Sequence, residues 1–191
     1  ARKRDPSTQL DLTPMERKIL ARKSFVASIW LKTGKKVYQA ITRGLFNFTD
    51  REGVTSVLID TSPDLREQLI DANVDHIDAV FLTHEHADQT HGIDDLRSVV
   101  MHQRRRIPVY FNQSTAKDIM ARFSYCFISP EGSDYPPILT RHSIEAGESH
   151  ETEGKGGPVR LSAFLVQHGK IPALGYRIGD AAYTPDLHDI P

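Results

Sequence analysis

The sequence lacks several features that would assign the protein to a specialised class. It has one cysteine, Cys126, which excludes an intramolecular disulfide and fits a reducing compartment. No apolar run approaches the roughly 18 residues of a membrane-spanning helix, and no segment resembles a signal peptide. A formal net charge of -1 gives no indication of nucleic-acid binding. We therefore predict a cytoplasmic protein without membrane contact.

Length and context set further expectations. The 191 residues are enough for one substantial domain with its own hydrophobic core. Cys126 has aromatic and aliphatic neighbours in residues 123–128, so we expect it to pack in that core rather than to act as a nucleophile. The chain begins at Ala1 without an initiator methionine and stops at Pro191, close behind an expected strand. We therefore expect a fold that is incomplete at its C-terminus.

The composition changes near residues 49–53, where we divide the chain. Residues 17–48 carry lysine and arginine but no acidic residue, so residues 1–53 form an atypical basic segment, with a helix expected to begin near Pro14. This segment is either an arm for nucleic acid or a membrane surface, or a solvated helix or extension. We favour the second interpretation. Residues 54–191 form the second unit.

Strands and helices are expected to alternate in the second unit, which predicts an α/β fold. We expect Ser62-Pro63-Asp64 to begin a helix and Ser114 to cap another. Residues 129–158 are rich in glycine, proline and serine and are expected to have little regular structure. The expected strands are 54–59, 78–83, 107–111, 159–167, 174–178 and 181–184, and the expected helices are 62–73, 93–103 and 114–123.

One loop carries most of the chemical information. His84, His86 and Asp88 occupy alternate positions directly after the apolar run 79–82. Imidazole and carboxylate suit Zn²⁺, Mn²⁺ or Fe²⁺. Ligands at alternate positions cannot share one helical face, and Asp88 stands where a helical two-histidine zinc motif would need its second histidine. The spacing favours an open metal site at a strand end, and hence metal-assisted hydrolysis.

Two further ligands are expected from distant sequence. His168 directly follows the strand 159–167, and Asp186 follows the short strand 181–184. Both positions are at strand ends, as His84 is. His91, just before a glycine at a helix start, is expected to contact the metal ligands or the fold around them rather than to bind metal.

These residues carry a family resemblance. The pattern His84-x-His86-x-Asp88, with Asp60 upstream at a strand end and His168 and Asp186 downstream, resembles the metallo-β-lactamase-fold hydrolases over residues 54–191. Within that superfamily, three segments resemble the branch containing phosphoribosyl 1,2-cyclic phosphate phosphodiesterase: 58–65, 91–97 and 182–187.

The resemblance implies an αβ/βα sandwich with metal bound at one edge of two packed sheets. It implies that His84, His86 and His168 hold a first metal and that Asp186 bridges to a second. Metal binding lowers the pKa of water from about 15.7 to about 7, which makes hydroxide available at neutral pH. Two metals about 3.5–4 Å apart can also clamp a phosphodiester oxygen.

The resemblance implies that Asp88 binds the second metal and orients the attacking hydroxide. It also implies that Asp60 supports the loop that contains His84, His86 and Asp88. The chain departs from the family at Gln89, where a histidine usually binds the second metal. It also lacks the final histidine expected after His188, and residues 32–48 show no equivalent of the usual glycine-rich opening strand. The first metal site is therefore well supported, and the second is doubtful.

We therefore predict a hydrolase that uses a divalent metal, zinc or manganese, and a metal-bound hydroxide. Its expected substrate is a small cyclic phosphate or nucleotide-like ester. Two alternatives stay open: a thioester, lactam or lactone hydrolase or RNA-processing nuclease of the same fold, and a truncated, non-catalytic chain that binds a nucleotide or one metal. The sequence assigns no substrate-binding residue and no oligomeric state.

Overall fold

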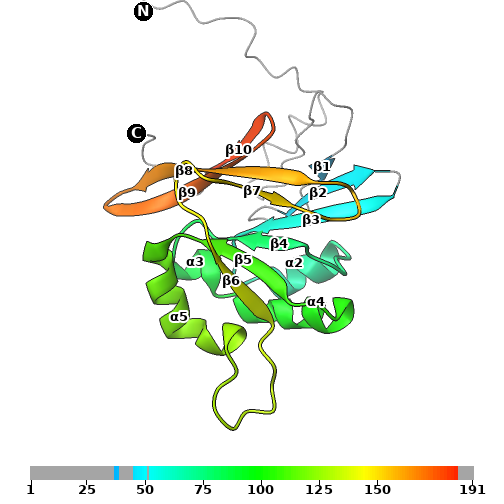
Figure 1. Ribbon diagram of the computed structural model, residues 1–191, viewed down its shortest axis with the longest axis vertical. Helices are drawn as coiled ribbons and strands as arrows, with labels where there is room; N and C mark the ends of the chain where they lie inside the picture. Colours follow the sequence, from blue (N-terminus) through cyan, green and yellow to red (C-terminus); the bar gives the residue numbers. More distant parts are fainter. Residues whose placement is uncertain (1–36, 39–44, 51, 185–191) are drawn as a thin grey trace, which may run out of the picture.

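Two stacked β-sheets form the centre of the protein in a computed structural model, which describes residues 37–38, 45–50 and 52–184 (Figure 1). The larger sheet has six strands in the order β1-β2-β3-β4-β5-β6. Strands β3 to β6 are parallel, and β1, β2 and β3 are joined by antiparallel pairing. The strands are β1 Val37–Tyr38, β2 Leu45–Asp50, β3 Gly53–Ile59, β4 Ala79–Phe81, β5 Ile107–Phe111 and β6 Leu139–Ser143.

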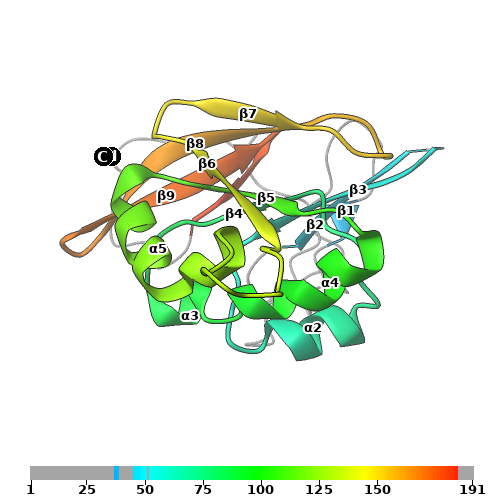
Figure 2. The ribbon, with the colours of Figure 1, turned by 60° about the horizontal axis from the view of Figure 1, so that its bottom comes forward.

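The smaller sheet has four antiparallel strands in the order β10-β9-β8-β7. Its strands are β7 Ser149–Thr152, β8 Val159–His168, β9 Ile171–Ile178 and β10 Ala181–Tyr183. In both ribbon views this sheet lies on one side of the six-stranded sheet, and the helices lie on the other (Figure 2). The helices are α2 Leu65–Asp71, α3 Ala87–Thr90, η2 Ile93–Asp95, α4 Leu96–Gln103 and α5 Gln113–Phe127.

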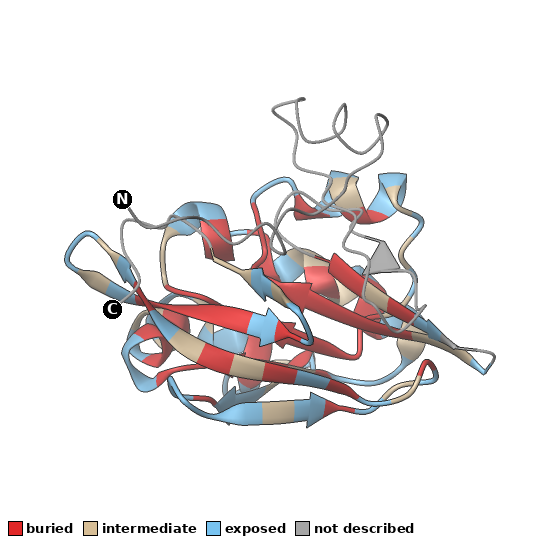
Figure 3. Cartoon of the chain, turned by 90° about the horizontal axis from the view of Figure 1, so that it is seen from above, coloured by how far each residue is buried: buried red, intermediate tan, exposed pale blue. Residues whose placement is uncertain are grey.

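The six-stranded sheet separates two hydrophobic cores, because successive side chains of a strand point to opposite faces. In β4, Val80 joins the core under the helices, whereas Ala79 and Phe81 join the core between the sheets. In β5, Val109 and Tyr110 divide in the same way. Buried residues, red in Figure 3, accordingly run along the strands where the layers meet.

The predicted α/β class and the two packed sheets are confirmed, as is the core position of Cys126, which is fully buried against the helices. Burial raises the pKa of the Cys126 thiol to about 12, and the nearby Asp94 carboxylate acts in the same direction. No helix in the described ranges is long and apolar enough to cross a membrane. The helix expected near Pro14 lies outside the described residues.

The division of the chain near residues 49–53 falls inside a hairpin of the large sheet. Strand β2 pairs with β3 from Leu45↔Leu58 to Asp50↔Gly53. Residues 45–50 therefore belong to the same sheet as the residues that follow them, and residues 32–48, which show no glycine-rich opening strand in the sequence, contain β1 and the start of β2.

Two local predictions are wrong. Residues 129–158 contain β6 and β7, whose sequences LTRHS and SHET are mostly exposed edge positions and so lack an apolar pattern. The side chain of Asn112, rather than Ser114, caps α5 by accepting a hydrogen bond from the Thr115 N–H at 2.9 Å. Asparagine caps as well as serine does, and the cap lies two residues before the predicted one.

Candidate metal centre

The candidate metal centre lies where two parallel strands end. Asp60 directly follows β3, and His84 follows β4 after Leu82 and Thr83. Because β3 and β4 run parallel, their carboxyl ends meet at one edge of the sheet, which is where open α/β sheets usually bind ligands. Residues 83–92, the ligand loop, begin at this edge.

Three imidazoles converge at this edge. The candidate ligand atoms of His84, His86 and His168 all lie within 4.8 Å of one another. The ring centroids are 4.6 Å apart for His84 and His86, 5.2 Å for His84 and His168, and 5.1 Å for His86 and His168. His84 is fully buried and the other two are half-buried. We call these residues the three-histidine cluster.

The three-histidine cluster joins the two sheets. His84 and His86 come from the loop after β4 of the large sheet, whereas His168 is the last residue of β8 in the small sheet. His168 pairs with Ile171 across a tight turn in which Gly169 has a positive φ of 60°. Glycine adopts this backbone conformation without steric cost, so the turn holds the His168 backbone at a fixed register.

A hydrogen-bonded chain supports His84. The Asp60 carboxylate accepts from the Thr83 N–H at 2.8 Å and from the Thr83 hydroxyl at 2.9 and 3.0 Å. Thr83 Oγ1 also lies 3.0 Å from His84 Nδ1. The hydroxyl has one hydrogen, and an ionised carboxylate can only accept it. With an ionised Asp60 the hydroxyl is an acceptor for His84 Nδ1–H, and this arrangement favours the tautomer of the neutral ring that has its lone pair on Nε2.

The backbone of Asp60 is bent to make this contact. Asp60 has a φ of 62° and is fully buried. Few residues other than glycine adopt positive φ, although aspartate tolerates it better than most. The Asp60 N–H donates to the Phe81 carbonyl at 2.9 Å, so the bend both ties β3 to β4 and aims the carboxylate at Thr83.

The small sheet holds the start of the ligand loop from the other side. The Leu174 N–H of β9 donates to the Thr83 carbonyl at 2.8 Å. The Tyr176 hydroxyl, also on β9, donates to the Leu82 carbonyl at 2.7 Å. Burial raises the pKa of Tyr176 well above its usual value, and the charge of Asp60 acts in the same direction. Tyr176 therefore remains a neutral donor.

Asp88 and Gln89 lie on the short helix α3, next to the three-histidine cluster in sequence. Asp88 is exposed, and its Oδ2 accepts from Gln89 Nε2 at 3.1 Å. Gln89 is fully buried, and its backbone carbonyl accepts from the Thr61 N–H at 2.6 Å. Within the described residues, the group close enough to share an ion contains the three histidines and not Asp88.

The other residues predicted for the site do not belong to the three-histidine cluster. His91 is exposed, and its ring lies 5.8 Å from that of Phe123 in an edge-on contact. Gly92 approaches the segment between β3 and α2 so closely that a Cβ there would lie 2.0 Å from the Ser62 carbonyl oxygen. Asp186 lies outside the described residues.

Sequence reasoning did not identify Thr83, the first residue of the ligand loop, or Tyr176 and Arg122, which contact Leu82 just before the loop and Glu85 within it. Thr83 is a hydroxyl residue between an apolar run and the first histidine, which is a usable signal. Tyr176 and Arg122 give none, because each reaches the loop from a distant element: Arg122 Nη1 of α5 donates to the Glu85 carbonyl at 2.7 Å.

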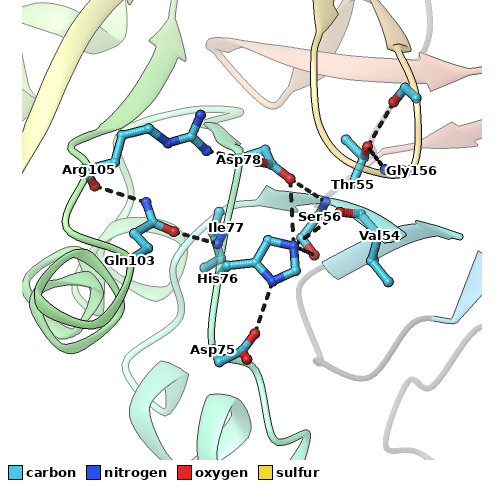
Figure 4. A network of polar contacts seen from close by, with 11 residues as sticks. Val54, Thr55, Ser56, Asp75, His76, Ile77, Asp78, Gln103, Arg105 and Gly156 are labelled. Carbon is cyan, nitrogen blue, oxygen red and sulfur yellow. Dashed lines mark hydrogen bonds and ion pairs between the residues drawn. The ribbon is translucent and has the colours of Figure 1, made fainter. Parts of the chain in front are cut away.

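A hollow of about 930 Å³ lies at the opposite ends of the parallel strands, and its lining includes Val54 and Lys155. Next to it, the Asp78 carboxylate binds the Arg105 guanidinium at 2.8 Å and the Ser56 N–H at 2.9 Å (Figure 4). These contacts join the starts of β3, β4 and β5.

The same network fastens the β7–β8 loop to the large sheet. The Thr55 hydroxyl donates to the Gly157 carbonyl at 2.8 Å and accepts from the Gly156 N–H at 3.0 Å (Figure 4). His76 lies beside it, with Nδ1 3.0 Å from Asp75 and Nε2 3.2 Å from the Val54 carbonyl. This edge is a structural connection between the two sheets, remote from the three-histidine cluster.

Two stacked sheets with histidines converging at the strand ends define a metallo-β-lactamase-type fold. A family model for the beta-lactamase superfamily domain matches residues 55–191. The chain therefore belongs to the beta-lactamase superfamily, as the sequence predicted.

Individual relatives agree with this assignment. A diphosphatase of the PhnP family has a TM-score of 0.63 and 31% identity, with 78% of this chain and 54% of that chain covered. It bears out the predicted resemblance to the phosphodiesterase branch. The metallo-beta-lactamase-fold protein YhfI from Bacillus subtilis has a TM-score of 0.51 and 18% identity, covering 73% of this chain and 53% of that one. This second similarity shows the fold alone.

A curated relative has a different kind of name. An octanoyltransferase from Porphyromonas gingivalis (strain ATCC BAA-308 / W83) is 36% identical over 136 residues, which are 70% of this chain and 26% of that protein. The chain thus spans about a quarter of that relative and about half of the PhnP-family diphosphatase.

The residues present fit a divalent cation. Three imidazoles offer neutral nitrogen donors, the set found in many catalytic zinc sites. The Thr83 contact fixes the His84 tautomer, as the outer hydrogen bonds of metal-binding histidines usually do. The three-histidine cluster could therefore hold one metal ion.

Proposed function

We propose that the protein is a metal-dependent hydrolase that cleaves a phosphoester bond in a small cyclic phosphate or nucleotide-like substrate. The observation that carries this proposal is the three-histidine cluster, in which the Thr83 hydroxyl contacts His84 Nδ1. The PhnP-family diphosphatase, whose similarity covers 78% of the present chain, supports a phosphate substrate.

The donor set favours zinc over manganese. Imidazole nitrogen suits zinc, whereas manganese prefers carboxylate, carbonyl and water oxygen. Asp88 and Asp186 are the oxygen ligands proposed for a second ion, and Gln89 is a weaker donor than the histidine that the family usually has at its position. We therefore propose one zinc site formed by the three-histidine cluster, with any second ion bound more weakly.

The metal, when bound, would supply Lewis acidity that lowers the pKa of water and stabilises charge on a phosphate oxygen. The chain itself supplies orientation. Asp60 and Thr83 fix His84, and Gln89 Nε2 holds Oδ2 of Asp88. We propose that Asp88, an exposed residue two positions after His86, accepts a proton from the attacking water, and that His91 supports the ligand loop through its contact with Phe123.

Hydrolysis of an activated phosphodiester by the purified chain tests this proposal. We expect zinc-dependent release of 4-nitrophenol from bis(4-nitrophenyl) phosphate. Asp88→Asn should lower the rate by at least about 100-fold, the usual contribution of general acid–base catalysis. Asp118→Asn, which removes an exposed carboxylate on α5, is the matched control. Equal rates for the two variants would exclude Asp88 as the proton acceptor.

Thioester hydrolysis is the second candidate, because a relative of this chain is named an octanoyltransferase. The name describes acyl transfer, and the match covers only 26% of that protein. An octanoyl thioester should therefore be assayed beside the phosphodiester. Cleavage of the thioester alone would replace the phosphoester proposal, whereas cleavage of neither substrate by zinc-loaded protein would favour a binding function.

A further inference from the structure

We propose that Arg122 is a positioning residue that holds the peptide between two metal ligands. Its Nη1 donates to the Glu85 carbonyl at 2.7 Å, across 37 residues of sequence. Glu85 stands between His84 and His86 in the ligand loop. The inference rests on the metal centre that forms part of the proposed function.

The position of this carbonyl explains the effect. A peptide unit is planar, so the Glu85 carbonyl and the His86 N–H lie in one plane. A bond that fixes the carbonyl also fixes the plane from which the His86 side chain departs. Asp60 bonds Thr83, Thr83 contacts His84, and Tyr176 bonds Leu82; the Arg122 contact adds support beyond the first histidine.

Other contacts to this part of the loop are weaker or more local. The Thr90 hydroxyl lies 3.5 Å from the Glu85 carbonyl and 2.9 Å from the His86 carbonyl, and it belongs to the ligand loop itself. Arg122 instead belongs to α5, whose buried side chains are part of the core between the helices and the large sheet. A charged donor also forms a stronger hydrogen bond than a neutral one. The Arg122 contact therefore ties the loop to a separate, rigid element.

Helix α5 is kinked next to this contact. Phe123, the next residue, has non-helical angles of φ -126° and ψ 26° inside α5, and its ring lies against His91. Arg122 also approaches the Asp118 carboxylate at 3.4 Å, one helical turn earlier. The kinked part of α5 thus meets the ligand loop at both Glu85 and His91.

The positive charge of Arg122 can also lower metal affinity, which opposes the gain from positioning. Arg122 repels a bound cation, although its side chain is 38% exposed and water and salt screen the repulsion. If positioning dominates, loss of Arg122 weakens metal binding. If repulsion dominates, loss of Arg122 strengthens it. The sign of the change therefore separates the two roles.

The test compares Arg122→Met with Arg97→Met in the full chain. Arg97 is a matched control, because it is also helical, is 35% exposed and pairs with an aspartate on its own helical face. Zinc affinity is measured by competition with a chromogenic chelator, and the melting temperature is measured without metal. We expect Arg122→Met to bind zinc about 10–100-fold more weakly, as is usual when an outer hydrogen-bond partner of a ligand is lost.

Two further variants sharpen the result. Arg122→Lys keeps a charged donor and should recover part of the affinity, and Asp134→Asn, at an exposed residue in the loop before β6, should leave it unchanged. Similar metal-free melting temperatures for Arg122→Met and Arg97→Met would show that the loss is not general unfolding. Unchanged or tighter zinc binding by Arg122→Met would overturn the inference. Failure of the unmodified chain to bind zinc would instead overturn the metal centre on which the inference rests.

Discussion

Asp60 accepts hydrogen bonds from both the backbone N–H and the side-chain hydroxyl of Thr83. These two residues end neighbouring parallel strands, so the bonds lock the strand ends together at the point where the ligand loop begins. The same hydroxyl contacts His84 Nδ1. The orientation of the first candidate ligand is thus set by the sheet rather than by the loop.

Replacement of Thr83 by valine should weaken metal binding. Valine keeps the shape of threonine but removes the hydroxyl that links Asp60 to His84, so the His84 tautomer and ring angle are no longer fixed. We expect zinc affinity to fall by about 10–100-fold, measured by chelator competition. Thr140→Val is the control, because its hydroxyl also contacts a histidine, His142, but on β6. Equal affinities for the two variants would contradict the proposed role of Thr83.

Replacement of Tyr176 by phenylalanine should destabilise the fold. The hydroxyl bonds the Leu82 carbonyl in a fully buried position, and a buried acceptor left without its donor costs about 1–3 kcal/mol. Urea unfolding of the metal-free protein measures this cost. Tyr135→Phe, at a residue that is 76% exposed, should change stability by less than about 0.5 kcal/mol. A loss below that limit for Tyr176→Phe would mean that the bond between the sheets is unimportant.

Replacement of Gly92 by alanine should be more harmful than replacement of Gly132. The new Cβ at Gly92 would lie 2.0 Å from the Ser62 carbonyl oxygen and 2.7 Å from Leu65 Cβ. Overpacking typically costs about 1–3 kcal/mol, and a clash with backbone belongs at or above the upper end of that range. Gly132 has nothing within 4 Å, and only its φ of 74° resists a side chain, at about 1–2 kcal/mol. Unfolding in urea compares the two; the reverse order would show that the ligand loop adapts freely.

The protonation of His150 should follow its burial between the sheets. Burial lowers the pKa of His150, and the nearby His142 lowers it further. The unfolded chain therefore binds this proton at higher pH than the folded chain does, so stability falls as pH decreases through about 6.5 and the loss is complete below the folded pKa. An NMR titration should show a His150 midpoint below about 6.5 that rises in His142→Gln. An unshifted midpoint in both proteins would refute this.

Much of the fold follows from local patterns in the sequence. The parallel strands β3, β4 and β5 are buried apolar runs, and each can be located to within a few residues. Strands β6 and β7 could not be located, because polar edge strands are specified by pairing with a neighbour rather than by their own residues. The helix α5 could be located, but its cap could not, since Asn112 and Ser114 are both suitable caps.

Some residues of the candidate metal centre could likewise be predicted from the sequence, and others could not. The spacing of His84 and His86 and the strand-end position of His168 indicate a metal centre, and the structure brings these residues together. Arg122 and Tyr176 could not be predicted, because their contacts depend on where α5 and β9 pack. A periodic pattern shows which face of an element is buried, but not which backbone carbonyl a long side chain reaches.

The central claim is that the three-histidine cluster binds a divalent metal with ligands from both sheets. The most direct test is zinc content per chain, measured by elemental analysis after dialysis, in the unmodified protein and in His168→Ala. His168 comes from β8 and His84 from the loop after β4, so a shared ion requires both. We predict about one zinc ion per unmodified chain, the stoichiometry of a single three-histidine site, and a large loss in His168→Ala with the fold retained. Equal zinc content in the two proteins would contradict the claim.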